Sequence, residues 1–404
     1  MKIYTRAVWF CLPFLLLNAQ PVQIWSPESW ELVSPESSPA AGPPAVRMVG
    51  GRNAWASGLI AARGNAPFRN PRAQISDLQH SSGVAFPARL VTLRYGSRDH
   101  RDAFAQQHPR PRDSYFYLST TPPETAGTLV VRITAEIPPT APAGEYRGTL
   151  TLHANGQHQI PVQLLVGEGR IPDPGNYVSH VNDATSPDTV ALRYGVPMWS
   201  AEHWQKLEAS FRIYRALGQN VLHVPVILRA RLPDGSLSHP THYGSVEGMI
   251  RFRESGGRVE PDFQVFEQML LRWRDQVGVP QFIVLSLWDV SWGNFERDHL
   301  GPGLEAMVTG VNAQGQPRGI FVPYPGTPGS EALWQSVIQG ARDRVARLGW
   351  DPASVLIGIA HDRKPDNRVV EFYNHIAPEI HWNVISHMRG YGIRDGRMVI
   401  GEMQ

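Results

Sequence analysis

The sequence has only one cysteine, Cys11, which lies near the N-terminus. If the leader that contains it is removed, the mature chain has no disulfide, no thiolate metal site and no cysteine nucleophile. The sequence also lacks a P-loop, a GxSxG nucleophile elbow, an HExxH motif and a glycine-rich dinucleotide loop. These absences argue against the nucleotide-binding and hydrolase classes that depend on those motifs.

An excess of charge of either sign is missing as well. Lysine occurs only as Lys2, Lys206 and Lys364, and the formal net charge of the whole chain is +2. Without Lys2 and Arg6, the 36 remaining basic residues balance 36 acidic ones. This balance gives no indication of a nucleic-acid partner or of an anionic membrane surface.

No apolar run is long enough to cross a bilayer, which takes about 18 residues or more. The N-terminal run at 7–17 is shorter, and it follows the basic residues Lys2 and Arg6. Ala19 offers a small residue before a cleavage point at Gln20. We therefore predict that residues 1–19 are a signal peptide. The mature protein is then periplasmic or secreted, with no membrane attachment after cleavage.

The rest of the chain divides into two parts with different periodicity. Residues 20–172 carry alternating apolar and polar segments typical of strands, at 88–96, 128–138 and 144–167. The last segment reads as a hairpin, because Asn155-Gly156 is a strong turn signal between two alternating runs. Short strands with connections rich in Pro, Gly and Ser predict an antiparallel β-sandwich.

The segment 169–176 marks a boundary, since it holds two prolines and two glycines in eight residues. Beyond it, in 173–404, strand-like apolar runs alternate with amphipathic helical segments that begin at Ser200 and Ser330. The expected strands are 176–182, 220–228, 280–289, 354–360 and 381–387, and the expected helices are 200–219, 262–278, 330–350 and 366–376. This alternation predicts a parallel sheet and an α/β TIM-type (β/α) barrel.

The second part of the chain has fewer strand–helix units than a complete barrel. A complete eight-fold barrel takes about 250 residues, and the second part of the chain reaches what we count as the sixth unit. We therefore expect a barrel that is incomplete at its C-terminus, or a chain truncated at Gln404.

Active sites of such barrels lie at the C-terminal ends of the strands. Polar and aromatic residues follow the expected strands here: His180, Asn182, Arg229, Trp288, Asp289, Trp292, His361, Asp362 and His387. Any one of them has a plain structural reading, as a hydrogen-bonded histidine or a core tryptophan. Together they suit carbohydrate, because indoles pack on sugar C–H faces while Asp, Asn, His and Arg bond to hydroxyls. A metal site of Asp and His is an alternative, but no ligand spacing singles one out.

Two segments carry a family resemblance. "PAGEYRGTLTL" (142–152), preceded by "GRNAWASGLIAARG" (51–64), resembles the N-terminal β-sandwich of the glycoside hydrolase family 123 superfamily, in which a sandwich precedes a barrel. The resemblance implies an exported glycosidase that acts on N-acetylhexosamine-containing glycans. It also implies that the substrate's own acetamide group attacks, with no metal or other cofactor.

The resemblance implies a catalytic pair at the end of the fourth barrel strand, where the family has adjacent Asp and Glu residues. Asp362 matches the Asp, which orients the acetamide, but Arg363 occupies the position of the Glu, which is the general acid and base. A guanidinium stays charged and cannot donate a proton usefully at neutral pH. Its charge favours an ionised Asp362.

The proton donor is therefore an open question, with three answers. It comes from another strand end, where Asp289 is the nearest candidate and Glu296 follows; or it lies beyond Gln404; or the protein binds glycans without hydrolysing them. For the hydrolase we expect Asp362 and Asp289 to be catalytic. We expect a sugar pocket lined by His180, Trp288, Trp292, His361 and His387.

Overall fold

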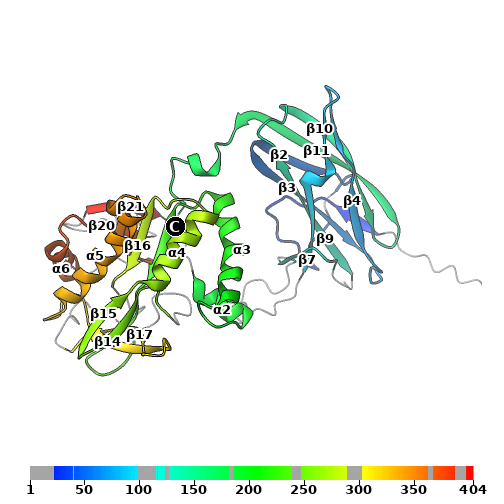
Figure 1. Cartoon of the computed structure of the whole chain (residues 1–404). Coiled ribbons are helices and arrows are strands. Elements are labelled where there is room, and N and C mark those ends of the chain that lie inside the picture. Colours follow the sequence, from blue (N-terminus) through cyan, green and yellow to red (C-terminus); the bar gives the residue numbers. More distant parts are fainter. Residues whose placement is uncertain are drawn as a thin grey trace, which may run out of the picture. The chain divides into compact units, whose positions relative to one another are not determined.

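The computed structural model describes residues 22–39, 41–97, 115, 117–122, 127–181, 186–238, 247–288, 303–362, 367–386 and 397–403 (Figure 1). The chain divides into two compact units, Met1–Pro172 and Asp173–Gln404. No helix in the described ranges has the length and apolar character needed to span a membrane.

The first unit consists of two β-sheets. One has the strand order β1-β3-β9-β7-β8, and the other has the order β2-β11-β10-β5-β6, with β4 also paired to β10. The strands of the first sheet are β1 (Gln23–Trp25), β3 (Ala54–Arg63), β9 (Thr128–Ile137), β7 (Val91–Ser97) and β8 (Tyr117–Ser119). Those of the second are β2 (Val46–Arg52), β11 (Gln157–Arg170), β10 (Gly144–His153), β5 (Leu78–His80), β6 (Ala85–Phe86) and β4 (Arg72–Ile75), and the helical turn η1 (Ala88–Leu90) precedes β7.

The predicted hairpin forms between β10 and β11. His153 pairs with Gln157 across a turn in which Asn155 has φ 51°, a left-handed conformation that asparagine tolerates. One apolar side of each strand is buried: Tyr146, Leu150, Leu152, Ile160, Val162 and Leu164 are at most 1% exposed. They share a core with the other sheet, so the two sheets pack face to face. The unit is not wholly antiparallel, since β2 pairs with β11 in parallel.

The centre of the second unit is a parallel sheet with the order β12-β16-β19-β20-β21. Its strands are β12 (Val221–Pro225), β16 (Phe282–Ser286), β19 (Val355–Asp362), β20 (His381–Ser386) and β21 (Arg397–Met403). Over the described residues this sheet stays open, because β12 and β21 are not paired with each other. The predicted alternation of strands and helices is confirmed here, but a closed TIM-type barrel is not.

The four predicted helices form beside these strands, and α2 (Pro187–Tyr194) is a further helix that the sequence analysis did not predict. The predicted helices are α3 (Ala201–Leu217), α4 (Gln264–Gln276), α5 (Glu331–Arg347) and α6 (Asn367–Ile376), with helical turns η2 (Pro174–Asn176) and η3 (Pro352–Ser354). Ser200 caps α3, since its hydroxyl accepts from the His203 N–H, and Gly218 ends the helix in a left-handed conformation. Ser330 precedes α5 but makes no side-chain cap.

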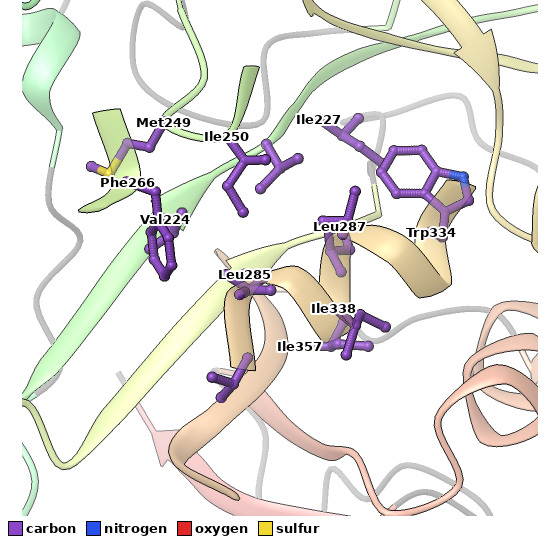
Figure 2. Packing of buried hydrophobic residues seen from close by; sticks show 14 of the residues in the cluster. Val224, Ile227, Met249, Ile250, Phe266, Leu285, Leu287, Trp334, Ile338 and Ile357 are labelled. Carbon is purple, nitrogen blue, oxygen red and sulfur yellow. The ribbon is translucent and has the colours of Figure 1, made fainter. Parts of the chain in front are cut away.

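A second sheet, which the sequence analysis did not predict, joins this unit. It has the order β13-β17-β14-β15, with β18 paired to β17. The strands are β13 (Ile227–Arg231), β14 (Arg251–Ser255), β15 (Arg258–Asp262), β17 (Glu305–Val311) and β18 (Pro317–Pro323). Its buried side chains belong to the same core cluster as the helices and the parallel sheet, and Figure 2 shows part of that cluster around Trp334.

Two expected strands differ from the structure. The run 220–228 splits after Pro225, so that β12 lies in the parallel sheet and β13 in the other. The segment 176–181 forms no strand; Val181 alone makes a bridge, to Gln219. In both places the apolar pattern is right, but pattern alone does not say which neighbour supplies the hydrogen bonds.

The two faces of the parallel sheet differ in polarity. Leu222, Val224, Ile283, Leu285, Val355 and Ile357 face the helices and join the main core cluster. Alternation along the strands puts Val221, Val284 and Leu356 on the opposite face. His223, Ser286 and Asn383 belong to that opposite face too, and all three are fully buried. The opposite face therefore carries a buried polar layer.

Gly358 occupies a position where no side chain fits. A Cβ atom there would lie 2.7 Å from the Asn383 carbonyl oxygen and 2.8 Å from Val284 Cγ1. The closeness arises because Gly358 pairs with Asn383, while both face the same side of the sheet as Val284.

We expect Gly358→Ala to lower the free energy of unfolding by about 1–3 kcal/mol, because the added methyl group forces the neighbouring strand away. Gly319→Ala on β18 is the matched control, since its Cβ would meet nothing closer than 3.5 Å. Urea unfolding of both variants measures the difference. Equal stability of the two variants would contradict the close approach at Gly358.

Burial lowers the pKa of His223 to about 4. The unfolded chain takes up a proton near pH 6.5, whereas the folded imidazole stays neutral until about pH 4. His223 therefore makes the free energy of unfolding fall by up to about 3 kcal/mol as the pH drops through this window, and has no such effect above it. Urea unfolding at pH 7.5 and at pH 4.5 should show a smaller pH-dependent loss for His223→Gln than for the unmodified protein. An identical loss would contradict this assignment.

Candidate active site

The carboxyl ends of β12, β16, β19 and β20 meet at one edge of the parallel sheet. The register is continuous there, since Pro225 pairs with Ser286, and Leu285 pairs with Ile357. Ligands of open parallel α/β sheets bind outside the carboxyl ends of the strands. The candidate site is therefore formed by the residues that lie at this edge.

Asp362 ends β19 at this edge, directly after an irregularity in the pairing. Gly358 pairs with Asn383 and Asp362 pairs with Ile385, so three residues of β19 stand opposite one residue of β20. This is the arrangement of a β-bulge, which re-aims the chain and is common next to active sites. His361 belongs to the bulged segment. The catalytic and binding roles of His361 and Asp362 remain predictions.

His180 does not lie at the carboxyl edge of the sheet. Its ring packs edge-on against Phe282, with centroids 5.0 Å apart, and Phe282 is the first residue of β16. The adjacent Val181 bridges to Gln219, which precedes β12. The structure thus places His180 at the amino ends of the strands instead of the carboxyl ends. The reason is that the expected strand 176–182 does not form over its described residues, and the chain reaches the sheet only at Val181.

Two other predicted site residues, Trp288 and Arg229, lie in the core or in a strand pair. Trp288 follows β16, is 2% exposed and belongs to the main core cluster, in keeping with its reading as a core aromatic. Arg229 lies on β13 and pairs with Met307 of the second sheet. Asn182, Asp289, Trp292, Glu296, Arg363 and His387 lie outside the described residues.

Tyr373 of α6 forms a hydrogen bond to the residue that follows β16. Its buried hydroxyl donates a hydrogen bond of 2.6 Å to the Leu287 carbonyl oxygen. Burial, followed by the nearby Tyr324, raises the pKa of Tyr373 well above its ordinary value, so the hydroxyl stays a neutral donor. This contact holds the chain in place just before Trp288 and the segment that follows it.

The sequence analysis missed Glu247. The Met249 N–H donates to the Pro225 carbonyl oxygen at the end of β12, over 2.8 Å, and the Gly248 N–H donates to Thr309 Oγ1 of β17, also over 2.8 Å. These bonds hold the half-buried Glu247 at the carboxyl edge of the sheet. Burial raises its pKa, while the Arg251 charge and the Trp199 side chain oppose the shift. A polar loop of this kind gives no periodic signal from which to find the residue.

Trp199 immediately precedes the Ser200 cap of α3 and was also missed. Its φ angle is 59°, which is unusual for a bulky residue. The Trp199 N–H donates to His203 Nδ1 over 2.9 Å, so His203 carries its proton on Nε2, which donates to the Pro187 carbonyl oxygen over 2.8 Å. Burial lowers the pKa of His203, although the Pro187 bond and Asp188 act the other way. The neutral imidazole therefore holds Trp199 in a strained conformation.

Among the residues that the structure describes, no three His, Cys, Asp or Glu side chains lie close enough to hold a metal ion. What the edge does offer is a group of side chains near the end of β12: the half-buried carboxyl group of Glu247, the indole of Trp199 and the guanidinium of Arg251. Such a set suits a neutral, polar ligand with apolar faces.

Comparison with solved structures finds a relative with a similar fold. It is a family 123 glycoside hydrolase from Clostridium perfringens, described for glycolipid glycan hydrolysis, with 14% sequence identity and a TM-score of 0.62. The match covers 90% of this chain and 63% of the Clostridium chain, so this chain spans less than two thirds of that relative. A search of curated proteins gave no match.

Other glycosidase structures match more loosely. A family 39 glycoside hydrolase from Bacteroides cellulosilyticus is 10% identical, with a TM-score of 0.26 over 84% of this chain and 50% of its own. A family 20 exo-β-N-acetylglucosaminidase from Vibrio harveyi is 6% identical, with a TM-score of 0.21 over 87% and 76%. Scores this low carry no argument about the site.

The family model for the catalytic domain of glycoside hydrolase 123 matches residues 185–387, which is half of the chain and includes β12, β16, β19 and β20. Together with the expectation from the sequence, this match establishes that the chain belongs to glycoside hydrolase family 123.

Proposed function

We propose that the protein is an exported glycoside hydrolase that acts on N-acetylhexosamine-containing glycans. Membership of family 123 supports a glycan substrate. The observation that carries the proposal is the position of Asp362, which ends β19 beside a bulge at the carboxyl edge of the parallel sheet. A carboxylate at this edge is well placed to act on a ligand that lies across the strand ends.

In the proposed mechanism the carbonyl oxygen of the substrate's acetamide attacks C1 of the sugar. Asp362 accepts a hydrogen bond from the acetamide N–H and stabilises the positive charge that develops on the amide. The bond from C1 to the leaving oxygen breaks, and that oxygen takes a proton from an acid. Water then adds to C1 and reopens the cyclic intermediate, so that the configuration at C1 is retained.

The sequence limits this mechanism at one point. Arg363 stands where the family has its acid and base Glu, and a guanidinium does not donate a proton at neutral pH. A second function is therefore open: a protein that binds the same glycans on the same scaffold without hydrolysing them. The two functions differ in whether turnover accompanies binding.

We expect Asp362→Asn to lower kcat on an aryl N-acetylgalactosaminide by roughly 100-fold or more, because the amide cannot stabilise the charged intermediate as a carboxylate does. Asp275→Asn on α4 is the control, since its carboxylate is exposed and pairs with its neighbour Arg274. Unchanged turnover in Asp362→Asn would remove Asp362 from the mechanism. Binding of the glycan without any turnover in the unmodified protein would favour the non-hydrolytic function.

Export is part of the proposal, and it rests on the basic residues Lys2 and Arg6 and the apolar run before Ala19. When the full chain is expressed with a functional secretion pathway, we expect a mature protein that begins at Gln20. Mass spectrometry of the purified product measures this directly. A product that retains residues 1–19 in the cytoplasm would contradict it.

A further inference from the structure

Glu247 lies where a second carboxyl group of the site would be needed. The two residues that follow it are anchored: the Met249 N–H donates to the last carbonyl of β12, and the Gly248 N–H donates to Thr309 Oγ1 of β17. Gly248 and Met249 are buried, while Glu247 is half-buried. The backbone just after Glu247 is therefore held in place, and the carboxyl group still has access to solvent.

The spacing of the strands is compatible with two carboxyl groups that serve one bond. Only β16 separates β12 from β19, and neighbouring strands lie about 4.8 Å apart, so β12 and β19 run about 10 Å apart. The register sets Pro225, the last residue of β12, level with Gly358, and Asp362 follows further along β19. The two carboxyl groups of glycosidases are about 5–10 Å apart.

The surroundings of Glu247 suit a sugar. Trp199 lies beside it, in a left-handed conformation that His203 enforces. Backbone strain of this kind is unfavourable and gathers at functional sites. The Trp199 ring packs against those of Trp204 and His203, with centroids 5.2 Å and 5.4 Å away, so it forms a partly buried apolar border beside the Glu247 carboxyl group.

Burial favours the protonated form of the Glu247 carboxyl group. Burial is the largest influence on its pKa and raises it, against the opposing effects of Arg251 and Trp199. Arg251 is partly engaged elsewhere, since its guanidinium lies 3.9 Å from the Asp262 carboxylate. A raised pKa is what a carboxylic acid needs in order to stay protonated and donate near neutral pH.

We propose that Glu247 is the proton donor of the hydrolase, in place of the Glu that Arg363 replaces. This inference rests on the proposed function and deepens it. The protonated carboxyl group gives its proton to the glycosidic oxygen as that oxygen leaves C1 with the bonding electron pair. The resulting carboxylate then takes a proton from the water that attacks C1, and Glu247 is protonated again.

The test compares leaving groups. A 2,4-dinitrophenyl N-acetylhexosaminide needs almost no proton to leave, whereas a methyl N-acetylhexosaminide needs one. We expect Glu247→Gln to lower kcat/KM, which reports the step in which the leaving group departs, by roughly 100-fold or more on the methyl glycoside and by less than about 10-fold on the dinitrophenyl glycoside. Asp362→Asn should lower both, because every substrate needs its acetamide stabilised. Azide should restore turnover of the dinitrophenyl glycoside by Glu247→Gln, since this anion attacks C1 without a general base.

Glu260→Gln is the matched control, an exposed glutamate on β15 of the adjoining sheet, and it should leave both activities unchanged. Equal losses on the two substrates, or full activity of Glu247→Gln on both, would overturn the role of Glu247 while the hydrolase function stands. An unmodified protein with no turnover on either substrate would overturn both. Unfolding temperatures of the variants separate misfolding from lost chemistry.

Discussion

The second unit depends on the pairing of β16 with β12 on one side and β19 on the other. These three strands are buried on both faces, beneath the helices on one and within a polar layer on the other. Because the register is continuous across them, their carboxyl ends lie side by side. Asp362 and Glu247 come from distant parts of the sequence, and this pairing, with the bonds of Gly248 and Met249 to Thr309 and Pro225, brings them to one edge.

Local sequence signals predicted the elements that carry their own start and stop residues. Helix α3 has Ser200 and Gly218 at its ends, and β10–β11 has Asn155-Gly156 at its turn. The strands of the second sheet were not predicted, although Gly256-Gly257 separates β14 from β15. Their runs are five to seven residues long, and short runs do not reveal which sheet they join.

The candidate site was predictable only where it follows an apolar run. Asp362 follows an apolar run and is the last residue of β19, so its position at the strand end was predictable. His180 was expected at the wrong edge, because its apolar neighbours Val178 and Val181 make no strand among the described residues. Glu247 and Trp199 depend on tertiary contacts, namely the bonds to Pro225 and Thr309 and the pairing with His203. No spacing in the sequence encodes such contacts.

The segments after β12 and β16 are built partly as hairpins instead of loose loops. β13 continues from β12 after Val226 alone, and β17 and β18 pair over seven residues. Their apolar side chains share the core with α5, as the surroundings of Trp334 show (Figure 2). A ligand that binds against these strands contacts a surface that is already ordered. Its affinity is then not reduced by the conformational entropy that a free loop loses on binding.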